Sequence, residues 1–483
     1  MLDIPSSILL IDGQWCDADS GRTYEVITPA KEDTLLSVAY GGQAETRRAL
    51  TAAARAMPAW RNENAWGRAA VLKRVADQLR DEAPTIARVL TLEQGKPLAE
   101  ANGEVLHAAD EFEWFAEEAK RAYGDVIPQA KNQKRHFTLK HPVGVVGAIV
   151  PWNFPIALMA RKLAPALAAG CTVVAKPASQ TPLATAQLFR VMLEAGVPPG
   201  VANLIVGDAS EVAAEFLANR ICRKVSFTGS TEVGKQLMRG CADQLKRVGL
   251  ELGGHAPFII FPDADPEMIA QLAVAGKFRN NGQVCIAPSR FYVHRDTASE
   301  FTEAVVAQTQ QLKLGDGLEE GVEIGPMFED RAMQHAVNLV EDAKRCGARI
   351  LTGGQRSAQF ERGYFFEPTV LDRVPDTARL LVDEPFAPVM PVIEFENLDQ
   401  VIEAANDTPY GLAAYVFTND VSTTWRMAEG LEAGIIGIND PVPTAVQCPF
   451  GGMKESGQGR ELGREGLAAY LETKYVSVGI KHE

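Results

Sequence analysis

The chain has 483 residues, which is too long for one simple core and predicts two or three structural units. Hydrophobic residues make up 46% of it and charged residues 23%, as in ordinary soluble globular proteins. The net charge of −14 at pH 7 argues against nucleic acid or an anionic membrane as the main partner. No apolar run has the length that a bilayer-spanning helix needs, so we expect no membrane partner.

The seven cysteines are scattered, with no CxxC pair and no Cys/His cluster at zinc spacing. This pattern predicts a reducing, cytoplasmic compartment and no metal site. The N-terminal stretch MLDIPSSILLIDGQW lacks a basic region, so we expect no signal peptide.

Residues 44–124 have the apolar periodicity of helices. Within them, Pro84 fits the first turn of a new helix and Gly95 fits its end. From residue 144 onward, short runs rich in Val and Ile alternate with helical stretches, which is typical of a doubly wound α/β fold with a parallel sheet. A similar alternation resumes after Gly254 and indicates a second α/β unit. The stretch KNQKRHFTLKH alternates polar and apolar residues and predicts a strand outside both sheets.

Four predicted strands of the first unit end in residues that can carry chemistry, and ligands of such sheets bind beyond the carboxyl ends of the strands. In PWNFP, two prolines stiffen a loop around Asn153, whose amide suits an oxyanion. A turn asparagine that satisfies its own backbone is an equal alternative. In KPASQTP, Lys176 and Ser179 can hold a ribose or a phosphate, and a solvated loop lysine is the alternative.

The third and fourth strand ends are FTGSTEVG and ELGGHAPFI. Gly229 and Ser230 precede a predicted helix, whose N-terminal N–H groups favour a phosphate, although such a glycine also serves simple turn geometry. Glu251 lies where the first unit meets the second and can act as a general base. The alternative for Glu251 is an acid at a helix end or on the surface.

Cys285, in GQVC, is either a nucleophile or a buried and inert thiol. The cysteine alone favours the inert thiol. A thiolate is nevertheless the best nucleophile that a side chain offers at neutral pH. The decision therefore depends on the residues that accompany it.

Taken together and in this order, PWNFP, KPASQTP, FTGSTEVG, ELGG, GQVC, EPFAP and PFGG resemble the NAD(P)-dependent aldehyde dehydrogenase superfamily. The separation of 34 residues between Glu251 and Cys285 matches that family as well. The resemblance covers nearly the whole chain. It implies the aldehyde dehydrogenase fold, with two doubly wound Rossmann-like open-sheet domains and a small β element for oligomerisation.

The resemblance implies three catalytic residues and no metal. Cys285 would attack the aldehyde carbon as a thiolate, giving a thiohemiacetal and then a thioester. The Asn153 side chain and the Cys285 backbone N–H would hold the oxyanion. Glu251 would activate the water that hydrolyses the thioester.

The resemblance also implies a site for NADP or NAD, contacted by eight residues: Trp152, Lys176, Ser179, Gly229, Ser230, Leu252, Glu384 and Phe386. Glu384 would contact the nicotinamide-side ribose, with Phe386 beside it. An acid in place of Ser179 would repel a 2′-phosphate. The neutral Ser179 with the charge of Lys176 therefore predicts that NADP is accepted.

Arg161 and Arg279 resemble the succinate-semialdehyde dehydrogenase branch, in which such a pair grips the distal carboxylate of the substrate. Guanidinium groups bind carboxylates bidentately. Thr444 would add a hydrogen bond. The alternative is that each arginine pairs with a carboxylate of the protein itself.

We therefore expect oxidation of a short ω-carboxy aldehyde, with succinate semialdehyde as the first candidate. The alternatives are 2-oxoglutarate semialdehyde, which GQVCIAPSRF also resembles, or another small aldehyde. A thiol esterase and a non-catalytic binding protein with this fold are rival functions. The expected partners are the small-molecule substrate and further copies of the chain, as a dimer or tetramer.

The expected domains are a cofactor-binding domain of residues 1–124 and 144–253 and a catalytic domain of residues 254–450. Residues 125–143 and 468–483 form the expected oligomerisation element.

Overall fold

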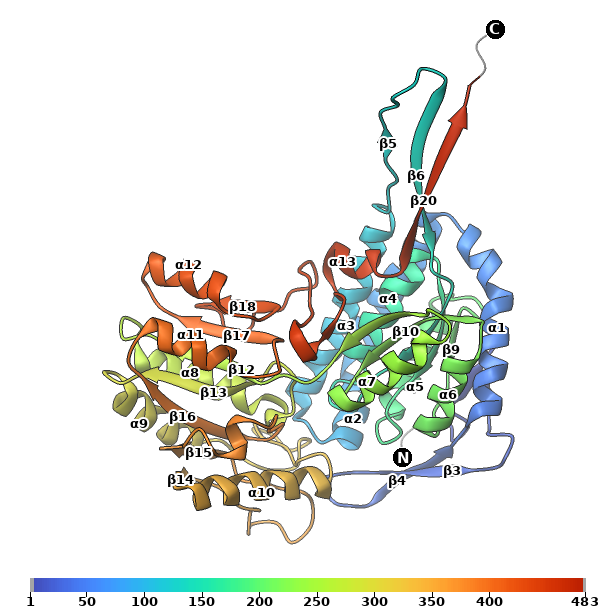
Figure 1. Cartoon of the computed structure of the whole chain (residues 1–483). Helices are drawn as coiled ribbons and strands as arrows, with labels where there is room; N and C mark the ends of the chain where they lie inside the picture. The colour runs from blue at the N-terminus through green and yellow to red at the C-terminus, as the bar shows by residue number, and fades with distance from the viewer. Residues whose placement is uncertain (1–3, 481–483) are drawn as a thin grey trace.

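The computed structural model describes residues 4–480 and shows two α/β parts, each built on an open sheet, with a narrow β arm (Figure 1). Residues 1–3 and 481–483, the outer ends of the predicted segments 1–124 and 468–483, lie outside the described residues. The predicted α/β fold with open, largely parallel sheets is confirmed.

The first sheet has eight strands in the order β19-β11-β10-β7-β8-β9-β1-β2. The strands from β11 to β9 are parallel, and β19, β1 and β2 are added antiparallel at the two edges. Their bounds are β1 Leu9–Ile11, β2 Gln14–Cys16, β7 Val145–Ile149, β8 Thr172–Lys176, β9 Ala202–Leu204, β10 Cys222–Thr228, β11 Arg247–Glu251 and β19 Gly457–Gln458.

The second sheet has seven strands in the order β14-β15-β16-β13-β12-β17-β18, and only the edge strand β14 is antiparallel to its neighbour. The bounds are β12 Ala256–Ile260, β13 Pro288–His294, β14 Arg349–Thr352, β15 Thr369–Asp372, β16 Val389–Phe395, β17 Ala413–Phe417 and β18 Ile435–Ile438. The turn from β11 to β12, only four residues long, carries the chain from one sheet to the other.

Helices fill the crossovers of both sheets. Those of the first part are α1 Gln43–Asn62, α2 Ala65–Gln94, α3 Leu98–Ala119, α4 Ala157–Ala169, α5 Leu183–Glu194, α6 Ala209–Ala218 and α7 Thr231–Ala242. Those of the second part are α8 Pro266–Phe278, α9 Ala298–Thr309, α10 Asp330–Cys346, α11 Leu398–Asn406 and α12 Val421–Gly430. Short 3-10 turns follow at η1 Arg279–Gly282, η2 Arg379–Leu381 and η3 Lys454–Ser456, and α13 spans Gly463–Ala468.

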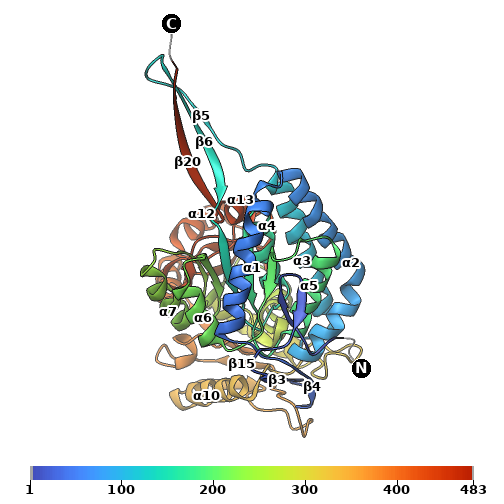
Figure 2. The ribbon, with the colours of Figure 1, turned by 90° about the vertical axis from the view of Figure 1, so that its right-hand side faces the viewer.

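The strand predicted in KNQKRHFTLKH is confirmed as β6, Lys134–Pro142. It pairs antiparallel with β20, Leu471–Gly479, and with the short β5, Val126–Ile127. The resulting three-stranded arm stands clear of both sheets in the two views of the ribbon (Figures 1 and 2). A two-stranded sheet of β3, Thr23–Ile27, and β4, Thr34–Ala39, is separate and was not anticipated from the sequence.

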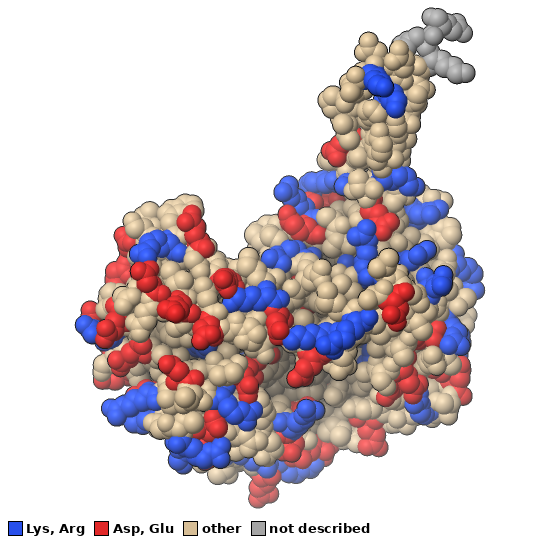
Figure 3. Space-filling view, in the orientation of Figure 1, with Lys and Arg blue, Asp and Glu red and all other residues tan. Residues whose placement is uncertain are grey.

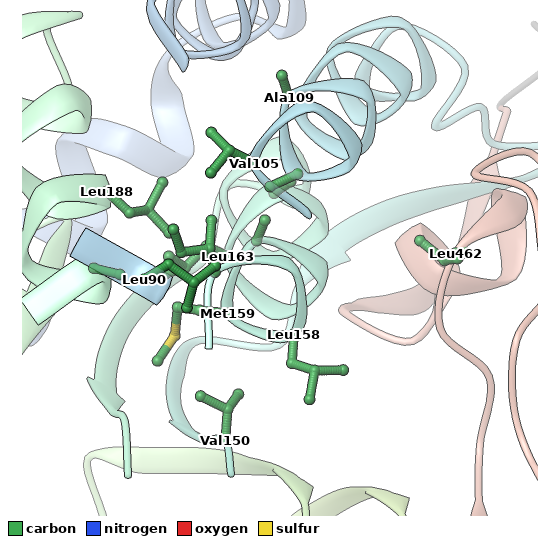
Figure 4. Packing of buried hydrophobic residues seen from close by; sticks show 14 of the residues in the cluster. Leu90, Val105, Ala109, Val150, Leu158, Met159, Leu163, Leu188 and Leu462 are labelled. Carbon is green, nitrogen blue, oxygen red and sulfur yellow. The ribbon is translucent and has the colours of Figure 1, made fainter. Parts of the chain in front are cut away.

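Helix α4 occupies the centre of the largest core cluster, and every one of its 13 residues is buried. Figure 4 shows Met159 and Leu163 of α4 near Leu90 and Leu188 of neighbouring helices, with Leu158 on another side of α4. A helix buried on all sides normally carries apolar residues only. The two charged residues of α4 therefore need partners inside the protein.

The prediction that a helix begins near Pro84 is wrong, because α2 runs through this proline without a break for 30 residues. Proline removes one backbone N–H and disfavours a helix interior. Pro84 is exposed, so water can reach the helix where that hydrogen bond is lost. The predicted helix end at Gly95 is confirmed, with a left-handed φ of 98° at that glycine.

Candidate active site

The predicted strand-end residues of the first sheet lie along one edge, because the strands that precede them are in register. Ile149 pairs with Lys176 on one side and with Phe227 on the other, and Thr228 pairs with Glu251. Parallel strands whose last residues are paired end at the same edge of a sheet, where such folds bind ligands. The turn into the second sheet begins at this edge, directly after Glu251.

Asn153 follows β7 and is joined to the loop that carries the predicted nucleophile. Its side-chain Nδ2 donates to the carbonyl of Gln283, two residues before Cys285, at 3.0 Å. An amide nitrogen has a second hydrogen, which this bond leaves free. Asn153 is buried, and its Oδ1 has no hydrogen-bond partner among the described residues. The residue is therefore placed as a fixed donor beside the Cys285 loop.

Glu251 is buried at the end of β11 and has an unpartnered carboxyl oxygen, Oε2, within the described part of the chain. Burial and the nearby charge of Glu461 raise its pKa well above the ordinary value, and Lys162 and Arg161 oppose this shift. A carboxylate with a raised pKa is a stronger base than a solvated one. This suits the predicted role of a general base.

Cys285 lies between the η1 turn and β13, half-buried, and its loop touches the crossover that follows Glu251. A Cβ on Gly254 would lie 2.3 Å from the Cys285 carbonyl oxygen, so glycine is required for this approach. Burial and the charge of Glu384 raise the pKa of the thiol to about 12, and Arg161 acts to lower it. At rest the side chain is a neutral thiol, so its reaction depends on a base.

Arg161 lies on α4, buried, and its Nε donates to Glu111 of α3 at 3.0 Å. Its guanidinium also lies 4.5 Å from the ring centroid of Phe450. The alternative, in which the arginine pairs with a carboxylate of the protein itself, is therefore confirmed for Arg161. That pairing uses one of the five guanidinium N–H groups, and Arg161 is close enough to Cys285 to affect its pKa.

Arg279 and Thr444 are placed differently from Arg161. Arg279 is exposed at the start of η1, with its guanidinium 5.2 Å from the ring centroid of Phe154. Among the described residues it forms no ion pair with a carboxylate. Thr444 is half-buried in the loop after β18, where its N–H donates to Val442. The structure records no contact of Thr444 with either arginine in the described residues.

Lys176 ends β8 and Ser179 follows it, and two strands, β7 and β10, separate β8 from β11 in the sheet. The Lys176 ammonium is buried and donates to the Pro177 carbonyl at 2.9 Å, and the Ser179 hydroxyl donates to Gly207 at 3.3 Å. Burial lowers the pKa of Lys176 to about 8, opposed by Asp208. The ammonium keeps two further N–H donors for a ligand.

Gly229 and Ser230 separate β10 from the 12-residue helix α7. The Gly229 N–H donates to the Glu251 carbonyl at 3.0 Å, and the exposed Ser230 is the N-cap of α7. Leu252 is buried against Gly234 of the same helix, where a Cβ would approach a Leu252 methyl to 2.5 Å. This close packing holds the N-terminus of α7 at the ligand edge.

Glu384 and Phe386 belong to the second part of the molecule but face the same crossover. Glu384 Oε1 accepts from the Gly254 N–H at 3.0 Å, and burial raises its pKa to about 7. Phe386, with a left-handed φ of 42°, meets Trp152 edge-on at 5.7 Å between ring centroids. Trp152 in turn stacks on Phe328 at 4.0 Å.

Several residues of the site were missed from the sequence: Lys96, Glu104, Glu111, Lys162, Lys277, Phe328 and Glu461. Lys162 is fully buried and pairs with Glu461 at 2.7 Å. Lys277 is buried, and burial lowers its pKa to about 7, opposed by Glu384. The one available signal was the pair of charges within an apolar helix in LMARKLAPAL. Within residues 4–480, no group of three possible metal ligands is present, and no helix is long and apolar enough to cross a membrane.

We predict that Cys285 of the free protein is alkylated by iodoacetamide at a rate that rises about tenfold per pH unit from pH 7 to pH 9, because only the thiolate reacts. Glu251→Gln removes a charge that raises the thiol pKa, so alkylation at pH 8 becomes faster. Mass spectrometry of the Cys285 peptide separates this thiol from the exposed Cys346 and Cys448.

The matched control is Glu267→Gln, the same change at an exposed acid on α8, which leaves the rate unchanged. A plateau of the rate below pH 9 in the unsubstituted protein contradicts the buried neutral thiol.

Comparison with known proteins agrees with this geometry. A model of the Aldehyde dehydrogenase family matches residues 15–476. A glutarate-semialdehyde dehydrogenase of Pseudomonas putida is 47% identical over 470 residues, covering 97% of each chain. The succinate-semialdehyde dehydrogenase [NADP(+)] of Escherichia coli is 47% identical over 471 residues, covering 98% of this chain and 97% of its own.

Among solved structures, a succinate-semialdehyde dehydrogenase from Burkholderia pseudomallei superposes with a TM-score of 0.96 at 44% identity, covering 98% of both chains. The match spans the complete fold, including both sheets and the arm. The chain belongs to the aldehyde dehydrogenase family.

Proposed function

We propose that this protein oxidises a short ω-carboxy aldehyde with NADP⁺ or NAD⁺, and that succinate semialdehyde is its substrate. The observation that carries the proposal is the buried guanidinium of Arg161, which is close enough to Cys285 for its charge to lower the pKa of the thiol. Arg279 adds a second guanidinium at the exposed rim, free of a protein carboxylate within the described residues. A substrate anion can be held by both groups.

The names of two similar proteins support an aldehyde that carries a negative charge as the substrate. One relative is a succinate-semialdehyde dehydrogenase and another a glutarate-semialdehyde dehydrogenase, both at 47% identity. Glutarate semialdehyde, one carbon longer, is therefore the second candidate. Glutarate semialdehyde is favoured over 2-oxoglutarate semialdehyde, because neither of these two relatives is named for the latter substrate.

In the proposed reaction, the Cys285 thiol gives its proton to water, and the sulfur forms a bond to the aldehyde carbon. The free N–H of Asn153 and the Cys285 backbone N–H stabilise the oxygen that becomes negative. The resulting thiohemiacetal becomes a thioester by losing a hydride, a step that needs a two-electron acceptor such as a bound nicotinamide. Glu251, whose raised pKa makes it a stronger base, would then accept a proton from the water that attacks the thioester carbon. The carbon–sulfur bond then breaks and the acid is released.

The residues at the sheet edge fit a nicotinamide dinucleotide, which when bound supplies a two-electron acceptor. The ammonium of Lys176, the Ser179 hydroxyl and the N-terminus of α7 suit phosphate and ribose oxygens. Glu384 keeps a second carboxyl oxygen for ribose hydroxyls, and the Trp152 and Phe386 rings form an apolar wall. These donors support NADP as well as NAD, in line with a relative named for NADP(+).

The proposed compartment is the cytoplasm, because all seven cysteines are free thiols, including Cys285. A reactive thiol persists in a reducing environment.

We also propose the division into a cofactor-binding domain, residues 1–124 and 144–253, and a catalytic domain, residues 254–450. Strand β19, Gly457–Gln458, lies beyond both and returns to the first sheet.

We predict that Arg279→Leu lowers kcat/KM for succinate semialdehyde about 10- to 100-fold, because a charge-assisted hydrogen bond contributes about 1.5–3 kcal/mol. For butanal, which has no carboxylate, the value changes less than threefold. Steady-state NADPH or NADH formation measures both.

Arg349→Leu is the matched control, since Arg349 is exposed on the edge strand β14 and pairs with Asp372 there. Arg161→Met gives the same substrate discrimination with an added loss of thermal stability, because Glu111 is left buried without its partner. Equal losses for butanal and succinate semialdehyde contradict the carboxylate clamp.

We predict that Ser179→Glu lowers kcat/KM for NADP more than tenfold and leaves that for NAD within threefold. Two like charges about 4 Å apart repel by about 4 kcal/mol at an effective dielectric constant of about 20. Ser299→Glu, the same change at an exposed position of α9, is the control. An unaltered NADP/NAD ratio in Ser179→Glu removes residue 179 from the proposed cofactor site.

We propose that the arm joins copies of this chain into a dimer or tetramer. It presents exposed apolar residues, with Val126 at 88% and Tyr475 at 59% accessibility. In Figure 3, uncharged residues cover much of the visible face of the arm, with a basic group near its top and charged groups toward its base. We predict that light scattering of the full chain gives a mass that is a multiple of 52.3 kDa. The substitution Tyr475→Asp lowers this mass. A monomeric mass for the unsubstituted protein contradicts the proposal.

A further inference from the structure

The main chain at Asn153 is held by a buried ion pair that lies outside the predicted site. Lys96, between α2 and α3, donates from Nζ to the Asn153 carbonyl at 2.7 Å and to Glu104 Oε2 at 2.6 Å. The side chains of Lys96 and Glu104 are 0% and 1% exposed. The ammonium also lies 3.8 Å from the ring centroid of Phe154, the next residue in the loop.

Glu104 holds the other end of the same loop. Its Oε1 accepts from the backbone N–H groups of Ile156 and Ala157 at 2.9 and 3.2 Å. These are orphan donors at the start of α4, where Ile156 occupies the N-cap and has no capping side chain. Lys96 and Glu104 together thus bind the segment on both sides of the oxyanion donor.

The neighbouring turn of α3 reaches the loop of the nucleophile. Glu100 accepts from the Asn280 N–H at 2.8 Å, and Asn280 Nδ2 donates to the Asn153 carbonyl at 2.9 Å. The Asn153 carbonyl therefore receives two donors, one from Lys96 and one from the Cys285 loop. A shift of this carbonyl would move the Asn153 side chain relative to Cys285.

We propose that Lys96 and Glu104 are positioning residues for Asn153, which set the oxyanion geometry without touching substrate or cofactor. The inference rests on the proposed role of Asn153. A buried pair of this kind is weak evidence for stability by itself, because hydrophobic replacement of such pairs is often neutral. Geometry is a stronger reason for it, since a misplacement of about 1 Å can cost about 100-fold in rate.

Lys96→Met is expected to lower kcat about 10- to 100-fold, with KM for aldehyde and cofactor within twofold of the unsubstituted enzyme. It also lowers the melting temperature, because Glu104 is left buried with an unmatched charge. The double variant Lys96→Met/Glu104→Gln removes that charge and regains most of the melting temperature. Its kcat stays low, because the donor to the Asn153 carbonyl is still missing.

The decisive measurement is kcat in an Asn153→Ala background. If Lys96 acts through Asn153, adding Lys96→Met to Asn153→Ala lowers kcat less than twofold further. A full multiplicative loss there, or a double variant that regains kcat together with its melting temperature, overturns the positioning role. Should Lys96→Met not fold, Glu104→Gln, which keeps a carbonyl oxygen for the start of α4, is measured in the same two backgrounds.

The result also separates this inference from the proposed function. If Asn153→Ala itself leaves kcat unchanged, the oxyanion role of Asn153 fails and the positioning role fails with it. If Asn153→Ala lowers kcat and both Lys96→Met and Glu104→Gln leave it unchanged, only the positioning role fails.

Discussion

Burial of charged side chains around helix α4 is the constraint on which the rest of the structure depends. An ion buried without a partner costs several kcal/mol, so each charge there has to find its counter-ion. Helix α3 supplies Glu104 to Lys96 and Glu111 to Arg161. Glu104 also accepts from the N–H groups of Ile156 and Ala157 at the start of α4. Because Glu104 and Glu111 lie seven residues apart, two turns along one face of α3, one register of α3 against α4 lets Glu104 reach this helix start and Glu111 reach Arg161. The same register fixes the loop before α4, and with it the edge where the strands end.

This buried environment also sets the resting state of the reactive groups. Burial raises the pKa of Cys285 and of Glu251 together. A neutral thiol is less readily oxidised than a thiolate, so burial protects the predicted nucleophile of the free protein. Glu251, three strands from Lys176 in the sheet, is a stronger base when ionised because its pKa is raised. The charge of Arg161 lowers the pKa of both groups, whereas the charge of Glu251 raises the pKa of Cys285.

The parts of the fold that follow from local patterns were predictable from the sequence. The parallel strands are continuous apolar runs, and residues at or beyond their ends, such as Glu251 and Asn153, lie at the same edge of the sheet because the strands are in register. The edge strands β1 and β2 were missed, since three residues carry too little periodicity. Pro84 was misjudged because a helix tolerates proline where the chain is exposed.

Residues that act through distant partners could not be found in the same way. Lys96 and Glu104 look like ordinary polar positions near a helix start, and only the packing of α3 on α4 brings them to Asn153. The resemblance to the family identified the groups expected to touch ligands. It said nothing of the residues that hold those groups, because such contacts are long-range and leave no spacing to recognise.

The two arginines predicted as an equal pair take different positions, and the difference bears on product release. Arg161 is already paired with Glu111, so the buried half of the clamp is close to neutral, whereas the exposed Arg279 forms no ion pair among the described residues. Under the proposed function the substrate carries one carboxylate and the product carries two. The second forms next to Cys285, where the acids Glu251 and Glu384 already act on the thiol. Like charges repel strongly in a buried site, so the reaction itself weakens the hold on its product. A clamp with two unpaired guanidinium groups would oppose that release, which gives a physical reason for Glu111 beside Arg161.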